Sequence, residues 1–211
     1  MYIQAPDRKP VTALRLQQMK VEGQRIAMLA AYDASFAAQL ETAGLDAVLV
    51  GDSLGMVVQG RDSTLPVTVD DIVYHCSAVA RGLRTALLIA DMPFMSERDV
   101  PHALESARRL LGEGGAAMVK IEGGGHVCEI IAALAAREVP VCAHLGLTPQ
   151  SVHRLGGYRV QGRTHDEAEH LLADAHAVAE AGAALLVLEC VPAALAERVT
   201  RALEIPVIGI G

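Results

Sequence analysis

Seven short, continuous apolar runs most constrain how this chain of 211 residues can fold. Each run has the length of a strand and is rich in Val, Ile, Leu and Ala; the runs cover residues 26–32, 46–51, 86–90, 117–121, 140–143, 184–188 and 206–210. Strands that are apolar throughout, rather than at alternate residues, are typical of strands buried on both faces, as in a parallel sheet covered by helices. The sequence therefore predicts buried parallel strands.

The stretches between these runs carry start and stop signals of helices. Asp33 precedes a predicted helix that reaches about Thr42, and Gly44 follows as its terminator. Thr68 can cap a second helix that continues through Ala80 and is closed by Gly82. Further helices are predicted at about residues 100–111, 127–136, 166–181 and 192–203. No linker or shift in composition divides these βα repeats, so we predict a single domain over residues 1–211.

Repeated βα units build either an open doubly wound sheet or a closed (βα)8 barrel. No G-x-G-x-x-G loop follows the first run, where a dinucleotide-binding open sheet would carry it. Instead, ionisable residues stand at or just past the ends of six runs: Asp33, Asp52, Asp91, Lys120 with Glu122, His144 and Glu189. A barrel gathers its strand ends around one mouth, so we predict an α/β fold of the (βα)8 TIM-barrel class. The chain as given ends near strand 7, so we expect the C-terminal βα unit to be missing from it.

Composition and charge narrow the range of partners. The chain has 25 acidic and 18 basic residues, a net charge of −7, only 3% aromatic residues and no Trp, which disfavours nucleic acid and anionic membranes as partners. No apolar stretch approaches the length of a membrane-spanning helix, and the first residues do not resemble a signal peptide. The four cysteines form no CxxC pair and are expected to be reduced. We expect a cytoplasmic protein.

Three carboxylates follow the second, third and fourth predicted strands: Asp52, Asp91 and Glu122. At one side of a barrel mouth they would repel one another unless a proton or a cation neutralised them. An all-oxygen set of ligands selects a hard ion such as Mg²⁺. The alternative is that each acid caps a helix or pairs with a surface arginine.

Three further polar residues lie at strand ends. Lys120 and Glu122 are two residues apart and share one face of a strand, so Lys120 either holds a substrate carboxylate or forms an ion pair. Glu189 ends an apolar strand, where burial would favour its neutral form and raise its pKa towards that of a general base; a core glutamate with satisfied hydrogen bonds is the alternative. His144 either donates a hydrogen bond to a ligand or is structural. Glycines 123–125 and 156–157 either admit a ligand or form turns.

Eight segments in order resemble the motifs of the ketopantoate hydroxymethyltransferase family. They are AYDASF at 31–36, VGDSLGM at 50–56, DSTLPVT at 62–68, DMPF at 91–94, KIEGG at 120–124, HLGLTPQ at 144–150, GGYRVQGR at 156–163 and LECVP at 188–192. The resemblance extends from about residue 12 to the end of the chain. One departure is Ala30, where we expect Thr; this touches no metal ligand.

The resemblance implies a barrel of the phosphoenolpyruvate/pyruvate type that binds Mg²⁺ and forms a homodecamer. Its implied reaction transfers a hydroxymethyl group from 5,10-methylenetetrahydrofolate to 3-methyl-2-oxobutanoate, through a Mg-stabilised enolate, and gives 2-dehydropantoate for pantothenate biosynthesis. Carried over by motif, the metal ligands fall on Asp52, Asp91 and Glu122. The groups that bind the 2-oxo acid fall on Asp52, Ser53, Asp91 and Lys120, and the proton acceptor falls on Glu189. His144 would then contact these residues without touching the metal or the substrate itself.

Two other functions remain open at this point. A Mg²⁺-dependent 2-oxo acid lyase of the same barrel type would use the same three carboxylates for cleavage instead of folate-dependent transfer. A non-catalytic barrel would bind a phosphorylated metabolite through the turn that contains Gly209 and Gly211, where many barrels hold phosphate.

Overall fold

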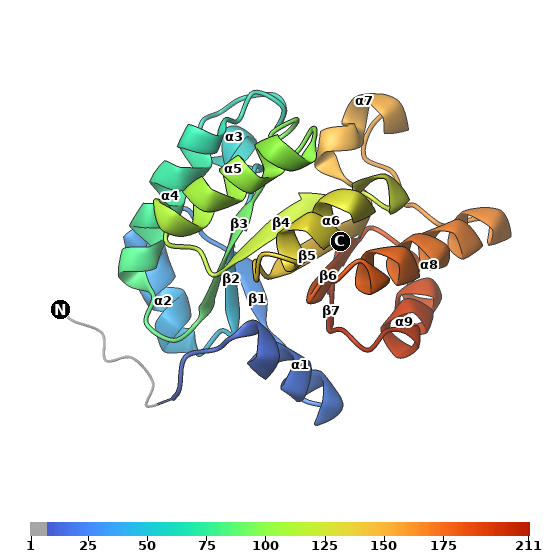
Figure 1. The fold of residues 1–211 in the computed structure, drawn as a ribbon, viewed down its shortest axis with the longest axis horizontal. Helices are drawn as coiled ribbons and strands as arrows, with labels where there is room; N and C mark the ends of the chain where they lie inside the picture. Colours follow the sequence, from blue (N-terminus) through green and yellow to red (C-terminus); the bar gives the residue numbers. More distant parts are fainter. Residues whose placement is uncertain (1–7) are drawn as a thin grey trace. The chain divides into compact units, whose positions relative to one another are not determined.

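The computed structural model describes residues 8–211, in which seven strands form one sheet (Figure 1). The strands are β1 (Met28–Ala30), β2 (Ala47–Val50), β3 (Leu87–Asp91), β4 (Met118–Glu122), β5 (Val141–Gly146), β6 (Leu185–Glu189) and β7 (Val207–Ile210). Each of the seven predicted runs therefore overlaps a strand. The strands are ordered in the sheet as they are in the chain, and β1–β2, β2–β3, β5–β6 and β6–β7 are parallel pairs. A doubly wound sheet reverses its strand order at a switch point, so this alternative is excluded.

The chain divides into two compact units, which are described separately. The N-terminal unit ends at Val119 and the C-terminal unit begins at Lys120. The helices of the N-terminal unit are α1 (Ala13–Val21), α2 (Ala34–Ala43), α3 (Leu54–Val57), α4 (Val69–Gly82) and α5 (Val100–Gly112). Helices α2, α4 and α5 lie side by side along strands β1–β3 (Figure 1). The buried apolar residues of these strands form the core beneath them.

Local hydrogen bonds fix the helix ends close to the predicted positions. The Asp33 carboxylate accepts the N–H groups of Ser35 and Phe36 at the start of α2, and Gly44 ends that helix in the left-handed region with φ of +80°. Thr68 and Asp71 form a reciprocal capping box at the start of α4. These ends were predictable because residues close in sequence form them.

Gly82 ends α4 as predicted, and its lack of a side chain also matters for packing. Its backbone lies so close to α2 that a Cβ atom would be 2.3 Å from the carbonyl oxygen of Ala34 and 2.8 Å from the Cβ atom of Ala37. The residue therefore allows α4 to approach α2, a role that the sequence pattern does not reveal.

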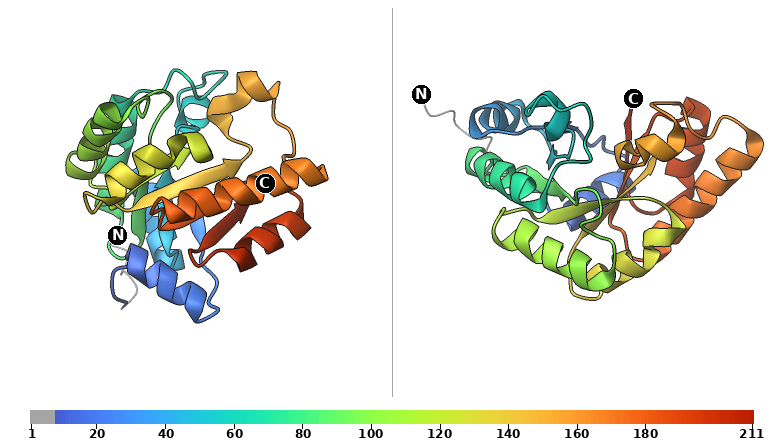
Figure 2. Two further views of the ribbon diagram at one scale, coloured as in Figure 1. Left: turned by 45° about the vertical axis from the view of Figure 1, so that its right-hand side comes forward. Right: turned by 90° about the horizontal axis from the view of Figure 1, so that it is seen from above.

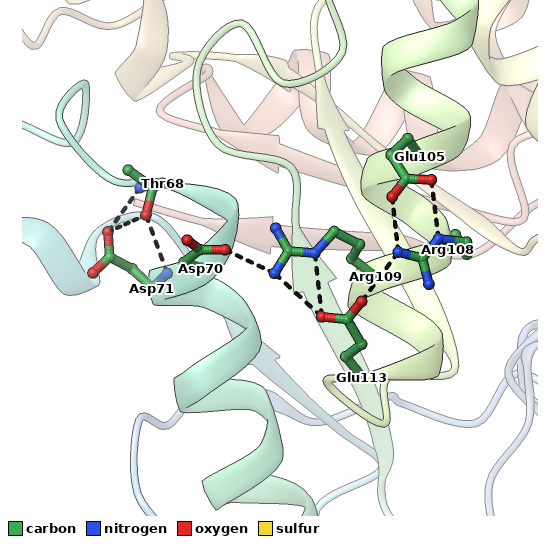
Figure 3. A network of polar contacts seen from close by, with 7 residues as sticks. All are labelled: Thr68, Asp70, Asp71, Glu105, Arg108, Arg109 and Glu113. Carbon is green, nitrogen blue, oxygen red and sulfur yellow. Dashed lines mark hydrogen bonds and ion pairs between the residues drawn. The ribbon is translucent and has the colours of Figure 1, made fainter.

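An exposed network of charges joins α4 to α5 (Figure 3). Arg109 lies 2.7 Å from the Asp70 carboxylate of α4 and 3.2 Å from Glu113 of its own helix end. Arg108 contacts Glu105 and Glu113 at 2.8 and 3.1 Å. Exposed ion pairs of this kind contribute about 0–1 kcal/mol each, so packing of the apolar faces holds the two helices together.

In the C-terminal unit, helices follow strands β5 and β6 and cover them. The helical elements are η1 (Gly125–Val127), α6 (Cys128–Ala135), η2 (Pro149–Ser151), α7 (Val152–Leu155), α8 (His165–Glu180) and α9 (Ala193–Ala202). Helices α8 and α9 flank strands β5–β7, with α6 next to α8 (Figure 2). All six predicted helices are present in the chain. The short helices α3 and α7 and the polar helix α1 were not predicted, because four residues or a weak apolar face give no clear period.

Candidate active site

Two buried acids lie together at the strand ends of the N-terminal unit. Asp91 is the last residue of β3 and Asp52 follows β2 by two residues, and their exposed fractions are 1% and 2%. The backbone N–H group of Asp52 donates to Oδ2 of Asp91 at 3.2 Å. A Cβ atom at Gly51 would lie 3.7 Å from the same oxygen, so the chain passes directly beside this carboxylate. Buried carboxylates need a compensating charge or a proton, which is consistent with a cation site here.

The negative charge of Asp91 also affects a cysteine of α4. Burial, with the charge of Asp91 as a second cause, raises the pKa of the Cys76 thiol to about 12. The thiol therefore stays protonated at neutral pH and offers no thiolate to a metal ion. Carboxylate oxygen atoms are then the donors that this region offers, and such donors suit the hard cation predicted from the sequence.

The third predicted residue of this unit, Ser53, is held by an aromatic side chain. Its Oγ atom lies 2.8 Å from the hydroxyl group of Tyr32, which follows β1. The ring of His75 in α4 stands edge-on to Tyr32, and its Nδ1 atom lies 2.7 Å from the carbonyl oxygen of Tyr32. Sequence reasoning singled out Ser53 but not Tyr32 or His75, although Tyr32 is part of a quoted motif.

A line of charged side chains crosses the ends of β4, β5 and β6 in the C-terminal unit. Lys120 Nζ lies 3.0 Å from Oε1 of Glu122, which confirms that the two side chains share a face. Nδ1 of His144 lies 3.3 Å from the same Oε1 atom, and Nε2 lies 3.3 Å from Oε2 of Glu189. Neither ring nitrogen meets hydrogen-bond geometry, so these two contacts are primarily electrostatic. Lys120, Glu122 and His144 are buried, whereas 20% of the Glu189 side chain is exposed.

The charges of this line determine two pKa values. Burial acts to raise the pKa of Glu122, but the charge of Lys120 and the contact with His144 outweigh it and hold the pKa at about 2. Oε2 of Glu122 also accepts the backbone N–H group of Gln150 at 3.1 Å. Burial and Lys120 act to lower the pKa of His144, but Glu122 and Glu189 together raise it. Glu122 is therefore ionised at neutral pH, and its neighbours favour a positive charge on the imidazole ring.

The glycine run after β4 packs against a carboxylate of α8. The N–H group of Gly125 donates to Oδ1 of Asp174 at 2.9 Å, and a Cβ atom at Gly124 would lie 2.2 Å from that carboxylate. Gly156 ends α7 in the left-handed region, with φ of +68°. Turn geometry and close packing thus explain much of both glycine segments. No local signal marks Asp174, which lies in the middle of a predicted helix.

Solved structures define the class of this protein. A putative phosphonomutase from Burkholderia cenocepacia superposes with a TM-score of 0.75 at 18% identity, covering 94% of this chain and 83% of its own. A 2,3-dimethylmalate lyase of the PEP mutase/isocitrate lyase superfamily superposes with a TM-score of 0.69 at 19% identity, covering 96% and 72%. These similarities confirm the predicted fold class, an α/β barrel of the TIM type.

Sequence comparison defines the family. Residues 10–211 match the family model of ketopantoate hydroxymethyltransferase. A 3-methyl-2-oxobutanoate hydroxymethyltransferase from Alkalilimnicola ehrlichii is 58% identical over 204 residues, which are 97% of this chain and 74% of that relative. The chain belongs to the ketopantoate hydroxymethyltransferase family, a family of one-carbon transferases. Within residues 8–211, none of the helices is both long and apolar enough to traverse a bilayer.

Proposed function

We propose that this protein transfers a hydroxymethyl group from 5,10-methylenetetrahydrofolate to 3-methyl-2-oxobutanoate and thereby forms 2-dehydropantoate for pantothenate biosynthesis. The observation that carries the proposal is the line formed by Lys120, Glu122, His144 and Glu189 in a chain that belongs to this family. At one end of the line Lys120 provides a cation for a substrate carboxylate, and at the other end, beyond Glu122 and His144, Glu189 provides a partly exposed carboxylate for proton transfer. Both are required for chemistry next to a keto group.

In this proposal Asp52, Asp91 and Glu122 hold one Mg²⁺ ion. The donor set fits this metal: all three groups are carboxylates on buried residues at the ends of consecutive strands. The contacts of Glu122 with Lys120 and Gln150 leave lone pairs on its oxygens, so it can act directly or through a water molecule. When bound, Mg²⁺ supplies Lewis-acid stabilisation of negative charge on the keto oxygen of the substrate, which is worth several kcal/mol.

The side chains of this chain then have separate roles. Lys120 and Ser53 bind the substrate carboxylate, with Asp52 and Asp91 at the same subsite, and so fix the orientation of C3. Glu189 takes the proton from C3, and the resulting carbanion forms a bond to the methylene carbon of the folate donor; water supplies the hydroxyl oxygen as the C–N bonds to folate break and tetrahydrofolate leaves. His144 lies against Glu189 and orients its carboxylate. A general base of this kind contributes about 10²- to 10⁴-fold to the rate.

Exchange of the C3 proton with solvent tests this assignment without the folate donor. We expect Glu189→Gln to lower the exchange rate of 3-methyl-2-oxobutanoate in D₂O by at least 100-fold, measured by proton NMR, with binding of the 2-oxo acid nearly unchanged. Glu197→Gln, on the exposed surface of α9, is the matched control and should exchange at the wild-type rate. Unchanged exchange in Glu189→Gln would remove Glu189 from the role of proton acceptor.

Dependence on the folate donor separates transfer from cleavage. The proposed enzyme forms product from 3-methyl-2-oxobutanoate and formaldehyde only with tetrahydrofolate, whereas a lyase of the same barrel type needs no folate.

We further propose that the protein is cytoplasmic and forms a homodecamer. Exposed apolar side chains on the N-terminal unit, including Val57, Val58 and Tyr74, support self-association. Analytical ultracentrifugation measures the number of subunits directly.

A further inference from the structure

A cavity of about 420 Å³ lies in the C-terminal unit beside the strand end that carries Glu189. Its lining includes the glycine run 123–125, residues of α8 and Gly146 at the end of β5. Gly146 is paired with Glu189 in the register of β5 and β6, and a Cβ atom there would lie 2.1 Å from the carbonyl oxygen of Glu189. The cavity therefore adjoins the backbone of the proposed proton acceptor.

The cavity contains a carboxylate whose position is fixed. Oδ1 of Asp174 is held by the N–H group of Gly125, and the bare Cα atom of Gly124 packs against the carboxyl group. Oδ2 points to Nε2 of His170 at 3.5 Å, and the His170 side chain is 81% exposed. The Asp174 side chain is itself 24% exposed, so Oδ2 can be reached by a ligand that brings N–H donors.

The other walls of the cavity carry apolar, cationic and neutral polar side chains, and the carboxylate of Glu167, whose Oε2 atom accepts the backbone N–H groups of Arg163 and Thr164. Leu145 and Leu171 line it, and both are otherwise buried, with exposed fractions of 4% and 8%. Arg154 of α7 also lines it, and no residue in the range 8–211 forms a hydrogen bond or an ion pair with its side chain. The combination suits a ligand with a flat ring, a face of N–H donors and a separate anionic group.

We propose that this cavity binds the folate donor, an inference that rests on the proposed function. Oδ2 of Asp174 accepts hydrogen bonds from the N3–H and 2-amino groups of the reduced pterin, whose flat ring lies against Leu145 and Leu171. Arg154 pairs with the carboxylates of the glutamate tail. The volume is within the range of about 300–1,000 Å³ that is typical of sites for ligands of this size. Because Gly146 lines the cavity and packs against the backbone of Glu189, a donor bound there would hold its one-carbon unit near the end of β6.

Two ligands distinguish the two ends of the proposed site by titration calorimetry. Tetrahydrofolate has both the pterin and the glutamate tail, whereas 6-methyltetrahydropterin has the pterin alone. We expect Asp174→Asn to weaken both ligands by at least tenfold, since it keeps an oxygen for Gly125 but loses the charge. Arg154→Gln should weaken tetrahydrofolate by at least fivefold and leave the pterin unchanged. Glu180→Gln, an exposed charge change on α8 that does not line the cavity, should affect neither.

The outcomes separate this inference from the proposed function. If wild-type protein binds tetrahydrofolate and both variants bind it equally well, the donor site lies elsewhere and the inference is wrong. An Arg154→Gln variant that loses the pterin as strongly as tetrahydrofolate would also overturn the assignment of the two ends. If circular dichroism shows that Asp174→Asn does not fold, binding of the two ligands to Arg154→Gln still tests the inference. Wild-type exchange of the C3 proton, measured without folate, tests the proposed function separately.

Discussion

Glu41 is a buried carboxylate that the proposed chemistry does not use, and it illustrates how single residues hold this fold. It lies near the end of α2 with an exposed fraction of 3%. Its oxygens accept the hydroxyl group of Thr85 and the backbone N–H groups of Arg84, Thr85 and Ala86. Burial acts to raise the pKa of Glu41, but these hydrogen bonds outweigh it and the pKa is lowered. The carboxylate thus fastens α2 to the segment that enters β3.

The lowered pKa predicts how stability depends on pH. A free Glu side chain has a pKa of about 4.3, so Glu41 contributes its full stabilisation above that pH and loses it as the pH falls towards the lower pKa of the folded state. We expect Glu41→Gln to cost about 1–3 kcal/mol in the free energy of unfolding at pH 7, and less at pH 3.5. Urea unfolding at both pH values measures this. Glu129→Gln, exposed on α6, is the control, and an equal cost at both pH values would contradict the prediction.

At the residue scale, the sequence predicted which charged residues lie at the strand ends, but not which residues each of them contacts. Asp52, Asp91, Glu122, His144 and Glu189 were singled out because an ionisable residue after an apolar run is conspicuous. Their contacts depend on the register between strands, which the chain sets only when it folds. We also expected Glu189 to be more deeply buried than it is, since its side chain remains partly exposed.

Among the helices, the pair α2 and α4 depends on a missing side chain. Gly82→Ala would place a Cβ atom 2.3 Å from the carbonyl oxygen of Ala34, so the helices must separate. We expect a cost of about 1–3 kcal/mol in the free energy of unfolding. Gly112, the last residue of α5, has open space around its Cα atom and no left-handed φ, so Gly112→Ala should raise stability by about 0.5–1 kcal/mol. Guanidinium unfolding compares the two variants, and a neutral Gly82→Ala would show that α4 can shift without cost.

The same pair of glycines shows the limit of sequence reasoning about elements. Each glycine ends a helix, and the sequence rule that places Gly at helix ends does not distinguish one from the other. Only the approach of α2 distinguishes Gly82, and that approach involves residues more than forty positions away. Strands and long helices were predictable because their periodicity and caps are local, whereas helices of four residues carry no period to read.

For the molecule as a whole, the proposed metal site predicts that stability depends on Mg²⁺. An ion that binds the folded chain and not the unfolded chain stabilises it by about 2.7 kcal/mol at a concentration of 100 times its dissociation constant. For a protein of this length we expect the midpoint of thermal unfolding to rise by about 5–10 °C, because each kcal/mol is worth roughly 2–4 °C. Differential scanning calorimetry with EDTA and with excess Mg²⁺ measures the shift.

Neutral variants of the proposed ligands then connect this shift to particular carboxylates. Asp52→Asn and Asp91→Asn should each abolish most of the rise, because Mg²⁺ binds charged oxygens far more strongly than amide oxygens. Asp62→Asn changes an exposed carboxylate of the same unit and should keep the full rise. A wild-type midpoint that does not respond to Mg²⁺, with or without 3-methyl-2-oxobutanoate, would contradict the metal site. A response that persists in both variants would instead place the ion at other ligands and leave these two acids as structural groups.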